Sequence, residues 1–346
     1  MDKSGRSTNR GRVALARLAH ALLVVLLPGQ LLPGLALVTT SESRAQASAW
    51  PTKPLRLVVP FAPGAVTDQI GRTVAARLSQ NLGQPVVVEN KAGAGGTLGA
   101  ELVAHAAGDG YTLLLGEPGS TAINATLMKG QLGFDPANDL IGVSQIVEVP
   151  LIMVAHPSLG IRSLAELPNA SRQRPLPYGS AGTGTMQHLT VEMLRLQSGA
   201  ALIHVPYRGG APAMTDLLSG QLPLLVLTVP TALPHLQAGK IVPLAVLSRA
   251  RVAAVSDVAT AIEEGYAGFA VVPWQGFFVP AATPTSLIVR LNAEIRRAAA
   301  SPDVHDKLTA VGNEVVTGTP EAFQQLVRDE TVRWAKVIKD AGVTAN

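Results

Sequence analysis

Two short loops combine glycines, hydroxyl side chains and other small residues in a way that is typical of anion binding. The first covers residues 60–68 and the second covers residues 178–185. Each is predicted to lead from a strand into a helix, where free backbone N–H groups and the positive end of the helix dipole favour a negative charge. The alternative for the first loop is a plain Pro-Gly turn with Asp68 capping the helix. The alternative for the second is a flexible linker.

Polar side chains around the second loop are candidates for direct contact with a ligand. Ser180, Thr183 and Thr185 offer hydroxyl groups, which both donate and accept hydrogen bonds. His188 lies just past the loop and is a further candidate, although a solitary helical histidine more often packs or caps. Tyr207 follows a later predicted strand, so we expect it beside the same pocket.

Several familiar chemistries are missing from the sequence. Residues 93–99 nearly match a dinucleotide fingerprint, but Leu98 stands where the third glycine is needed, and the cluster follows the second strand rather than the first. The chain has no cysteine, no Gly-x-Ser-x-Gly segment and no His-Glu-x-x-His segment. We therefore expect no catalytic residue, no metal site and no cofactor.

Basic charge is concentrated at the N-terminus. Residues 1–47 hold six of the 28 Lys and Arg and two of the 24 Asp and Glu, so the rest of the chain has 22 of each sign. This basic stretch, the apolar run 21–38 and the small residues that follow predict a signal peptide over 1–47, cleaved after Ala47 or Ala49. An uncleaved anchor is the alternative. We expect an exported, periplasmic protein that binds no nucleic acid.

Short apolar runs alternate with helical patterns after residue 50. Strands are predicted at 55–59, 86–88, 111–115, 151–154, 202–205 and 222–229. Helices are predicted after Asp68 with Gly83 at the end, and at 98–106 and 186–197, while Thr-Pro or Ser-Pro pairs at 283, 301 and 319 predict three more helix starts. This alternation predicts an α/β fold of two doubly wound lobes with mostly parallel sheets.

Segments typical of one family run through the whole chain after residue 50. The first reads WPTKPLRLVVPFAPG at 50–64 and is followed by Thr67-Asp68, and a later one reads HVPYRGGAPA at 204–213. Others lie at 83–90, 93–96, 109–114, 122–124, 180–184 and 274–280. In this order they resemble the Bug-type receptors, the periplasmic solute-binding proteins of tripartite tricarboxylate transporters.

The resemblance implies a fold of the periplasmic-binding-protein type, in which two lobes close on a solute in the cleft between them, like a Venus flytrap. Lobe 1 would comprise residues 50–149 and 272–346, and lobe 2 residues 150–271. Carried over by motif, the ligand-binding residues of lobe 1 are Phe61, Ala62, Gly64, Ala65, Thr67 and Asp68. Those of lobe 2 are Gly179, Ser180, Ala181, Gly182, Thr183 and Thr185, and the candidate set is completed by Ser120, His188 and Tyr207.

Three positions depart from the family pattern. Ala65 replaces the second glycine of the first loop, which restricts positive φ and would narrow the site. Glu117 stands where small hydroxyl residues are usual; facing the cleft it would favour a ligand with an amino group, and otherwise it is a solvated loop carboxylate. Thr228 ends a segment in which the family commonly has an acidic or amide residue. The solute is therefore expected to be a small carboxylate or an amino-acid-like molecule.

Taken together, these features predict a periplasmic solute-binding protein that captures a small organic carboxylate and delivers it to the membrane subunits of a tripartite tricarboxylate-type transporter. We expect a monomer that carries out no chemical step. A sensor that binds a solute for a signalling partner is one alternative. A secreted hydrolase on the same fold is another, against which the lack of a recognisable nucleophile–base pair counts.

Overall fold

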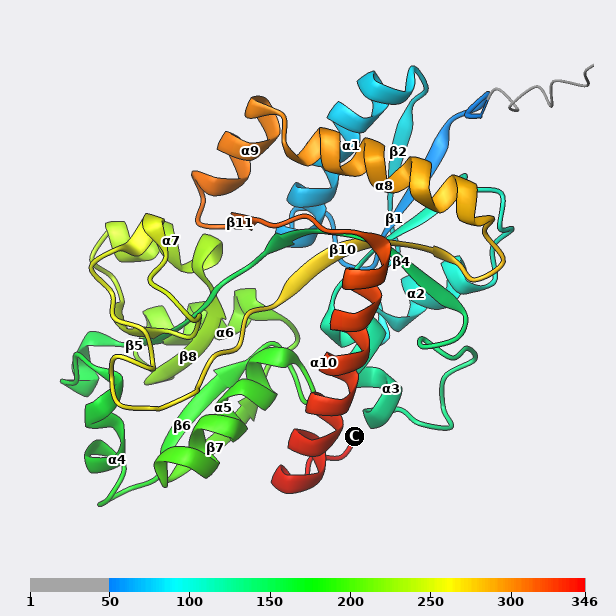
Figure 1. Cartoon of the computed structure of the whole chain (residues 1–346). Coiled ribbons are helices and arrows are strands. Elements are labelled where there is room, and N and C mark those ends of the chain that lie inside the picture. The colour runs from blue at the N-terminus through cyan, green and yellow to red at the C-terminus, as the bar shows by residue number, and fades with distance from the viewer. Residues whose placement is uncertain (1–49, 346) are drawn as a thin grey trace, which may run out of the picture. The chain divides into compact units, whose positions relative to one another are not determined.

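Two β-sheets organise the described part of the chain, residues 50–345 of the computed structural model (Figure 1). The predicted signal peptide and its cleavage sites lie outside these residues. The strands are β1 Leu55–Val59, β2 Val86–Asn90, β3 Thr112–Gly116, β4 Leu140–Glu148, β5 Leu151–Ala155, β6 Leu176–Ser180, β7 Leu202–Pro206, β8 Leu224–Thr228, β9 Val242–Val246, β10 Trp274–Pro280 and β11 Glu314–Val315. The strand order is β11-β4-β10-β3-β1-β2 in the first sheet and β7-β6-β8-β5-β9 in the second.

Helices follow most strands, as the alternating sequence pattern predicts. They are α1 Val66–Leu82, α2 Thr97–Ala104, α3 Asn124–Leu127, α4 Leu167–Ala170, α5 Met186–Ser198, α6 Gly210–Leu218, α7 Val229–Gln237, α8 Thr285–Ala299, α9 Pro302–Thr309 and α10 Pro320–Ala341. Two short turns, η1 Ala94–Gly96 and η2 Gly119–Ile123, precede α2 and α3. The α/β class predicted from the sequence is confirmed.

The predicted predominance of parallel pairing is wrong. The strands β1, β2 and β3 are parallel, as are β6, β7 and β8. However, β10 runs antiparallel to β3 and β4, and β5 runs antiparallel to β8 and β9. Neither β5 nor β10 follows a strand of its own sheet through an α-helical crossover, because the chain enters each of them from the other sheet, so nothing constrains them to be parallel.

Local sequence explains where several helices begin and end. Ile70, Val74 and Leu78 form the buried stripe of α1, and Gly83 ends this helix with a φ of +66°. At α10, Thr319 is the N-cap, and its side chain accepts a hydrogen bond from an amide of the first turn. At α8 the predicted cap is wrong, because the helix begins at residue 285 and Pro284 holds the N-cap position.

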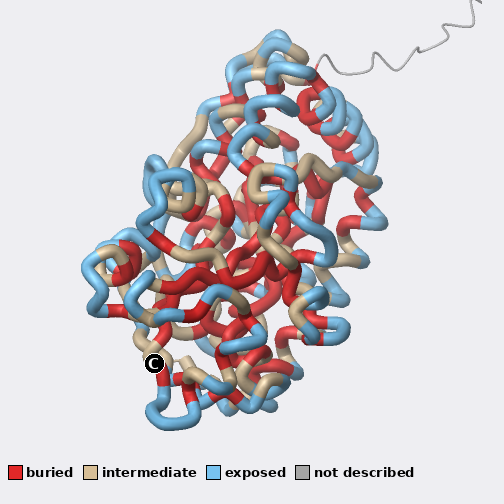
Figure 2. The backbone as a smooth tube through the Cα atoms, turned by 90° about the vertical axis from the view of Figure 1, so that its left-hand side faces the viewer, coloured by how far each residue is buried: buried red, intermediate tan, exposed pale blue. Residues whose placement is uncertain are grey.

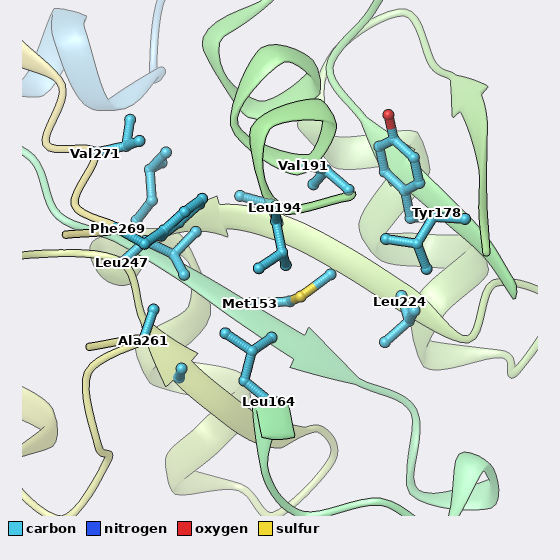
Figure 3. Packing of buried hydrophobic residues seen from close by; sticks show 14 of the residues in the cluster. Met153, Leu164, Tyr178, Val191, Leu194, Leu224, Leu247, Ala261, Phe269 and Val271 are labelled. Atoms are coloured by element: carbon cyan, nitrogen blue, oxygen red, sulfur yellow. The ribbon is translucent and has the colours of Figure 1, made fainter. Parts of the chain in front are cut away.

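The hydrophobic core is divided between the two sheets and linked by α10. Near the start of α10, Phe323 packs with Trp274 of the first sheet. Further along, Trp334 and Ile338 pack in a cluster that covers one face of the second sheet, in which Met153 and Leu224 are members (Figure 3). In Figure 2 the buried residues run through the interior of the described part, and exposed residues surround them.

Residues 50–345 belong to one compact unit, and within it we find no helix with the length and apolar character that a membrane span requires. The chain passes between the sheets twice, after β4 and after β9. The division into lobes 50–149 plus 272–346 and 150–271 stays a prediction. It assigns the whole of α10 to lobe 1, whereas the second half of this helix packs on the second sheet.

Candidate functional site

The loop after β1 is organised around the buried carboxylate of Asp68. One oxygen, Oδ2, accepts hydrogen bonds from the Gly64 amide at 2.9 Å and from Arg72 Nε at 3.0 Å. The other, Oδ1, accepts from Asn90 Nδ2 at 2.8 Å. The same Asn90 amide nitrogen also donates to the carbonyl oxygen of Phe61 at 3.0 Å, so the end of β2 holds both ends of the loop.

Asp68 is therefore not the N-cap that the sequence suggested. It is the third residue of α1, Ala65 occupies the N-cap position, and the carboxylate binds backward to Gly64 rather than to first-turn amides. Burial alone would raise the pKa of Asp68, but hydrogen bonds from Arg72, Gly64 and Asn90 outweigh it, so the pKa lies below its ordinary value. The side chain carries a negative charge that fixes the loop in shape.

The departure at Ala65 costs the loop nothing in backbone strain. Ala65 has a φ of −64°, which any residue adopts, whereas the positive φ of +82° falls on Gly64. The loop therefore needs no positive φ at residue 65, and the narrowing of the site by Ala65 stays a prediction. Gly64 and Ala62 are exposed, and Phe61 is half-buried.

Thr67 leads to a residue that the sequence did not single out. Its hydroxyl accepts a hydrogen bond from Gln275 Nε2 at 2.9 Å, which joins the first turn of α1 to β10. Gln275 is only 5% exposed, and its Oε1 is a buried atom without a hydrogen-bond partner among the described residues. A buried polar atom of this kind requires a ligand or water as partner. Its signal in the sequence was a glutamine within the apolar segment 274–280.

The segment after β3 holds Ser120 and Glu117 together. Both oxygens of the Glu117 carboxylate accept backbone hydrogen bonds of 2.9 Å, one from Gly119 and one from Ser120. Burial raises the pKa of Glu117, although these two hydrogen bonds oppose the shift. Glu117 is half-buried, and its carboxylate is bound within the turn, so its place relative to the cleft stays a prediction.

Ser120 and Phe61 both lie against the glycine cluster before α2. A methyl group at Gly96 would come within 3.0 Å of Ser120 Cβ and 3.4 Å of Phe61 Cζ. The glycine cluster within residues 93–99 thus allows the loops after β1 and β3 to pack closely together. Together with Thr67 and Gln275, these residues form the first group of candidates, at the carboxyl ends of parallel strands, where α/β sheets bind ligands.

The second group surrounds Ser180, the last residue of β6. Its side chain is fully buried, and Oγ donates to the Gly182 carbonyl at 3.0 Å and accepts from the Gly182 amide at 3.1 Å. His204 on β7 is the third partner, with Nε2 lying 2.7 Å from Ser180 Oγ. The half-buried residues Ala181 and Thr183 complete this turn.

His188 and Thr185 hold the end of the same loop. Thr185 is the N-cap of α5, and its hydroxyl accepts from the His188 amide at 3.4 Å and donates to the Gly182 carbonyl at 2.7 Å. The His188 ring is buried, and its Nδ1 accepts from the Gly184 amide at 3.0 Å. His188 is thus a capping residue of the loop.

Tyr207, which follows β7, packs behind the second loop. A methyl group at Gly179 would lie 3.3 Å from Tyr207 Cε2, so the tyrosine ring covers the strand that carries the loop. Its hydroxyl donates to Asp216 Oδ2 at 2.7 Å. Burial and the hydrogen bond to this carboxylate raise the pKa of Tyr207 to about 12.

The structure brings the candidates together as two groups, one at each sheet. Leu127 of α3 lies against Gly184, so the segment after β3 reaches the second loop. Sequence reasoning missed Gln275, Asn90 and His204, although all three stood in family-like segments, at 274–280, 83–90 and 204–213. Within residues 50–345, no cluster of three or more His, Asp or Glu side chains is arranged to hold a metal ion.

The comparisons with known proteins identify the family. Residues 70–343 match the family model described as "Tripartite tricarboxylate transporter family receptor". The chain belongs to this family of receptors. Protein BugT of Bordetella pertussis is 37% identical to the receptor over 299 residues, which is 86% of this chain and 91% of BugT.

Solved structures show the same fold. An R. palustris protein solved with adipate has a TM-score of 0.79 and 37% identity to the receptor, covering 85% of this chain and 99% of that one. MatC from Rhodopseudomonas palustris, with bound malate, has a TM-score of 0.74 and 34% identity, covering 83% and 99%. The family resemblance and the periplasmic-binding-protein type of fold, both predicted from the sequence, are confirmed.

A buried serine and a histidine of the second group have the geometry of a nucleophile and its base. The sequence showed no such pair, but Ser180 and His204 lie in hydrogen-bond contact. Three observations count against catalysis by this pair. Ser180 is 0% exposed, its hydroxyl is engaged with Gly182 on both sides, and burial lowers the pKa of His204 to about 4, which makes it a weak base.

Proposed function

We propose that this receptor captures a small organic carboxylate outside the cytoplasmic membrane and delivers it to the membrane subunits of a tripartite tricarboxylate-type transporter. Closure of the two predicted lobes around the solute would create the surface that the membrane subunits recognise. The work is recognition and needs neither a chemical step nor a cofactor. Export to the periplasm through the predicted signal peptide is part of the same proposal.

The pairing of two helix N-termini, each behind a small-residue loop, carries this proposal. The helices α1 and α5 both begin directly after such a loop, so the positive end of each helix dipole lies behind one of the two loops. A dicarboxylate bridging the two loops would place one carboxylate at the N-terminus of each helix. The relatives solved with adipate and with malate support this ligand class, since both molecules carry two carboxylates.

Gln275 adds a neutral hydrogen-bonding group to the proposed site. Its amide lies beside Thr67 in the first turn of α1 and has one unpaired end. We propose that a polar group of the solute, or a water bound with it, is the partner of this amide. Glu117, whose carboxylate accepts two backbone N–H groups, would then shape the segment after β3 rather than select an amino group.

A thermal-unfolding screen of adipate, malate and small amino acids tests the ligand class. A ligand at 100 times its Kd stabilises the folded state by about 2.7 kcal/mol, which raises the Tm by about 5 °C or more. Adipamide, which has the length of adipate without its charges, is the matched control and should leave the Tm unchanged. If no small acid raises the Tm more than its uncharged analogue does, the proposal fails.

Replacement of Ser180 tests where the solute binds. Ser180→Ala removes the hydroxyl that holds the Gly182 turn and should weaken binding about fivefold to tenfold, the effect of one buried hydrogen bond. Ser219→Ala is the control, because Ser219 is an exposed serine on the far end of α6. Equal affinities for the two variants would show that the second loop is not part of the site.

A further inference from the structure

Two histidines lie face to face behind the second loop. The rings of His188 on α5 and His204 on β7 are stacked, with centroids 3.7 Å apart and planes inclined by 11°. His188 is 5% exposed and His204 is half-buried. The two residues are 16 positions apart in the sequence, on different elements, so only the fold brings them together.

Each ring is bound to the loop through a different atom. Nδ1 of His188 accepts a hydrogen bond from the Gly184 amide, which requires this nitrogen to be unprotonated. Ser180 Oγ donates to the Gly182 carbonyl and accepts from the Gly182 amide, so the arrangement that satisfies all its partners has His204 Nε2–H donating to it. These bonds leave Nδ1 of His188 unprotonated, so His188 carries its proton on Nε2, and they place a proton on Nε2 of His204.

The surroundings also favour neutral rings. The ring of Tyr178 on β6 stacks on His188 and lies tilted against His204. Its hydroxyl, which points away from the hydrophobic cluster in Figure 3, donates to Glu192 Oε1 at 2.7 Å. The other oxygen of Glu192 accepts from Arg195 Nε at 2.8 Å. The one carboxylate close to the pair is thus already bound by two donors.

We propose that His188 and His204 are positioning residues that hold the loop around Gly182 and Gly184 in its binding shape only while both rings are neutral, so that the receptor binds its solute more weakly as the pH falls. This inference rests on the proposed function. A proton on His188 Nδ1 would face the Gly184 N–H and break that hydrogen bond. A proton on His204 would place a positive charge directly against the neighbouring ring.

The direction of the pKa shifts agrees with this geometry. Burial lowers the pKa of His188, with Glu192 opposing the shift. Burial, and then the neighbouring His188, lower the pKa of His204 to about 4, again with Glu192 opposing. A released loop would return the rings to an ordinary pKa of about 6.5. Acid therefore favours the released loop.

The size of the effect follows from proton linkage. With one histidine at a pKa of about 4 in the ordered loop and about 6.5 in the released loop, the ordered form loses about tenfold in relative population between pH 7.5 and pH 5.5. Solute binding should weaken by up to this tenfold over the same range, and by the full amount where the released loop predominates without solute. The probe is adipate, or malate if adipate does not raise the Tm.

Replacing each histidine by a residue with an amide side chain keeps its hydrogen bond to the loop and removes the titrating ring. Asn at residue 188 offers an amide oxygen at the place of Nδ1, and Gln at residue 204 offers an N–H at the place of Nε2. In the double variant H188N/H204Q the affinity for the probe should fall by less than about twofold between pH 7.5 and pH 5.5, whatever its value at pH 7.5. H105Q, at an exposed histidine of α2's C-cap, is the control and should keep the full pH dependence.

Calorimetric titration of these proteins at both pH values is the test, because protonation of the probe itself is common to all of them. An equal loss of affinity in the double variant and the natural protein would overturn the proposal. So would a double variant that fails to bind at pH 7.5 while remaining folded by circular dichroism.

Nuclear magnetic resonance separates this inference from the proposed function, because it needs no ligand. The sample is the protein in the form that its host cell produces. Both rings should carry their proton on Nε2 at pH 7.5, and the Gly184 amide signal should shift as the rings titrate. If the Gly184 signal shifts as the histidines titrate but no acid binds at any pH, the role of the histidines in holding the loop is supported and the proposed function fails. Rings that titrate without moving this signal would overturn the inference.

Discussion

Replacing Asp68 by Asn should destabilise the receptor clearly, because this carboxylate organises the first loop. It accepts hydrogen bonds from Gly64, Arg72 and Asn90 at 2.8–3.0 Å while 3% exposed. An amide has one accepting end, so at least one donor must lose its partner, at about 1–3 kcal/mol. The Arg72 side chain is 53% exposed, so its lost charge adds little. We expect about 2–3 kcal/mol in total.

Thermal and urea unfolding of the natural protein and the Asp68→Asn variant measure this loss. The expected decrease in Tm is about 4–8 °C at pH 7. Asp109→Asn is the matched control: Asp109 pairs with Lys53 at 3.5 Å, and the two side chains are 44% and 60% exposed. That change should cost less than about 0.5 kcal/mol.

The pH dependence provides a second measurement on the same variant. The folded-state pKa of Asp68 is lowered, so its contribution to stability is complete above the ordinary carboxyl pKa of about 4 and is lost as the pH falls through the folded-state value. The difference in stability between the natural protein and Asp68→Asn should therefore shrink in acid. Equal effects of Asp68→Asn and Asp109→Asn at pH 7 would refute the reasoning.

Two further predictions concern packing. Gly276→Ala should cost about 1–3 kcal/mol or more in urea unfolding, because the new methyl would overlap the Phe323 ring, whereas Gly210→Ala, which meets no atom within 4 Å, should be nearly neutral. Trp334→Phe should cost about 1–2 kcal/mol more than Trp50→Phe, because the indole of Trp334 donates to a glutamate one turn upstream and that of Trp50 has no partner among the described residues. Equal costs within either pair would contradict the packing described.

Periodicity in the sequence was sufficient to predict most of the local structure. The four-residue spacing of Ile70, Val74 and Leu78 predicted α1, and a helix whose apolar stripe matches its turn length forms wherever that stripe is covered. The small-residue loops were recognisable because glycine and hydroxyl residues at strand ends have few other uses. The class of fold and the family followed from these patterns and from the order of the motifs.

The roles of individual polar residues depended on contacts between distant segments. Asp68 looked like a cap because its own helix was visible in the sequence, but its partner Asn90 comes from a neighbouring strand. Ser180 looked like a free hydroxyl, but it lies 2.7 Å from His204 on a neighbouring strand. The antiparallel direction of β5 and β10 was equally hidden, because it depends on how the chain crosses between the sheets.

The sequence by itself determined that this chain forms an α/β receptor with two small-residue loops at strand ends, because backbone preferences act over a few neighbouring residues. Only the tertiary structure decided how those loops are held. His188 and His204 stack, and Gln275 reaches Thr67 from a strand 208 residues away in the sequence. Hydrogen bonding and desolvation depend on distance in space, and a linear pattern of residue types contains no such distances.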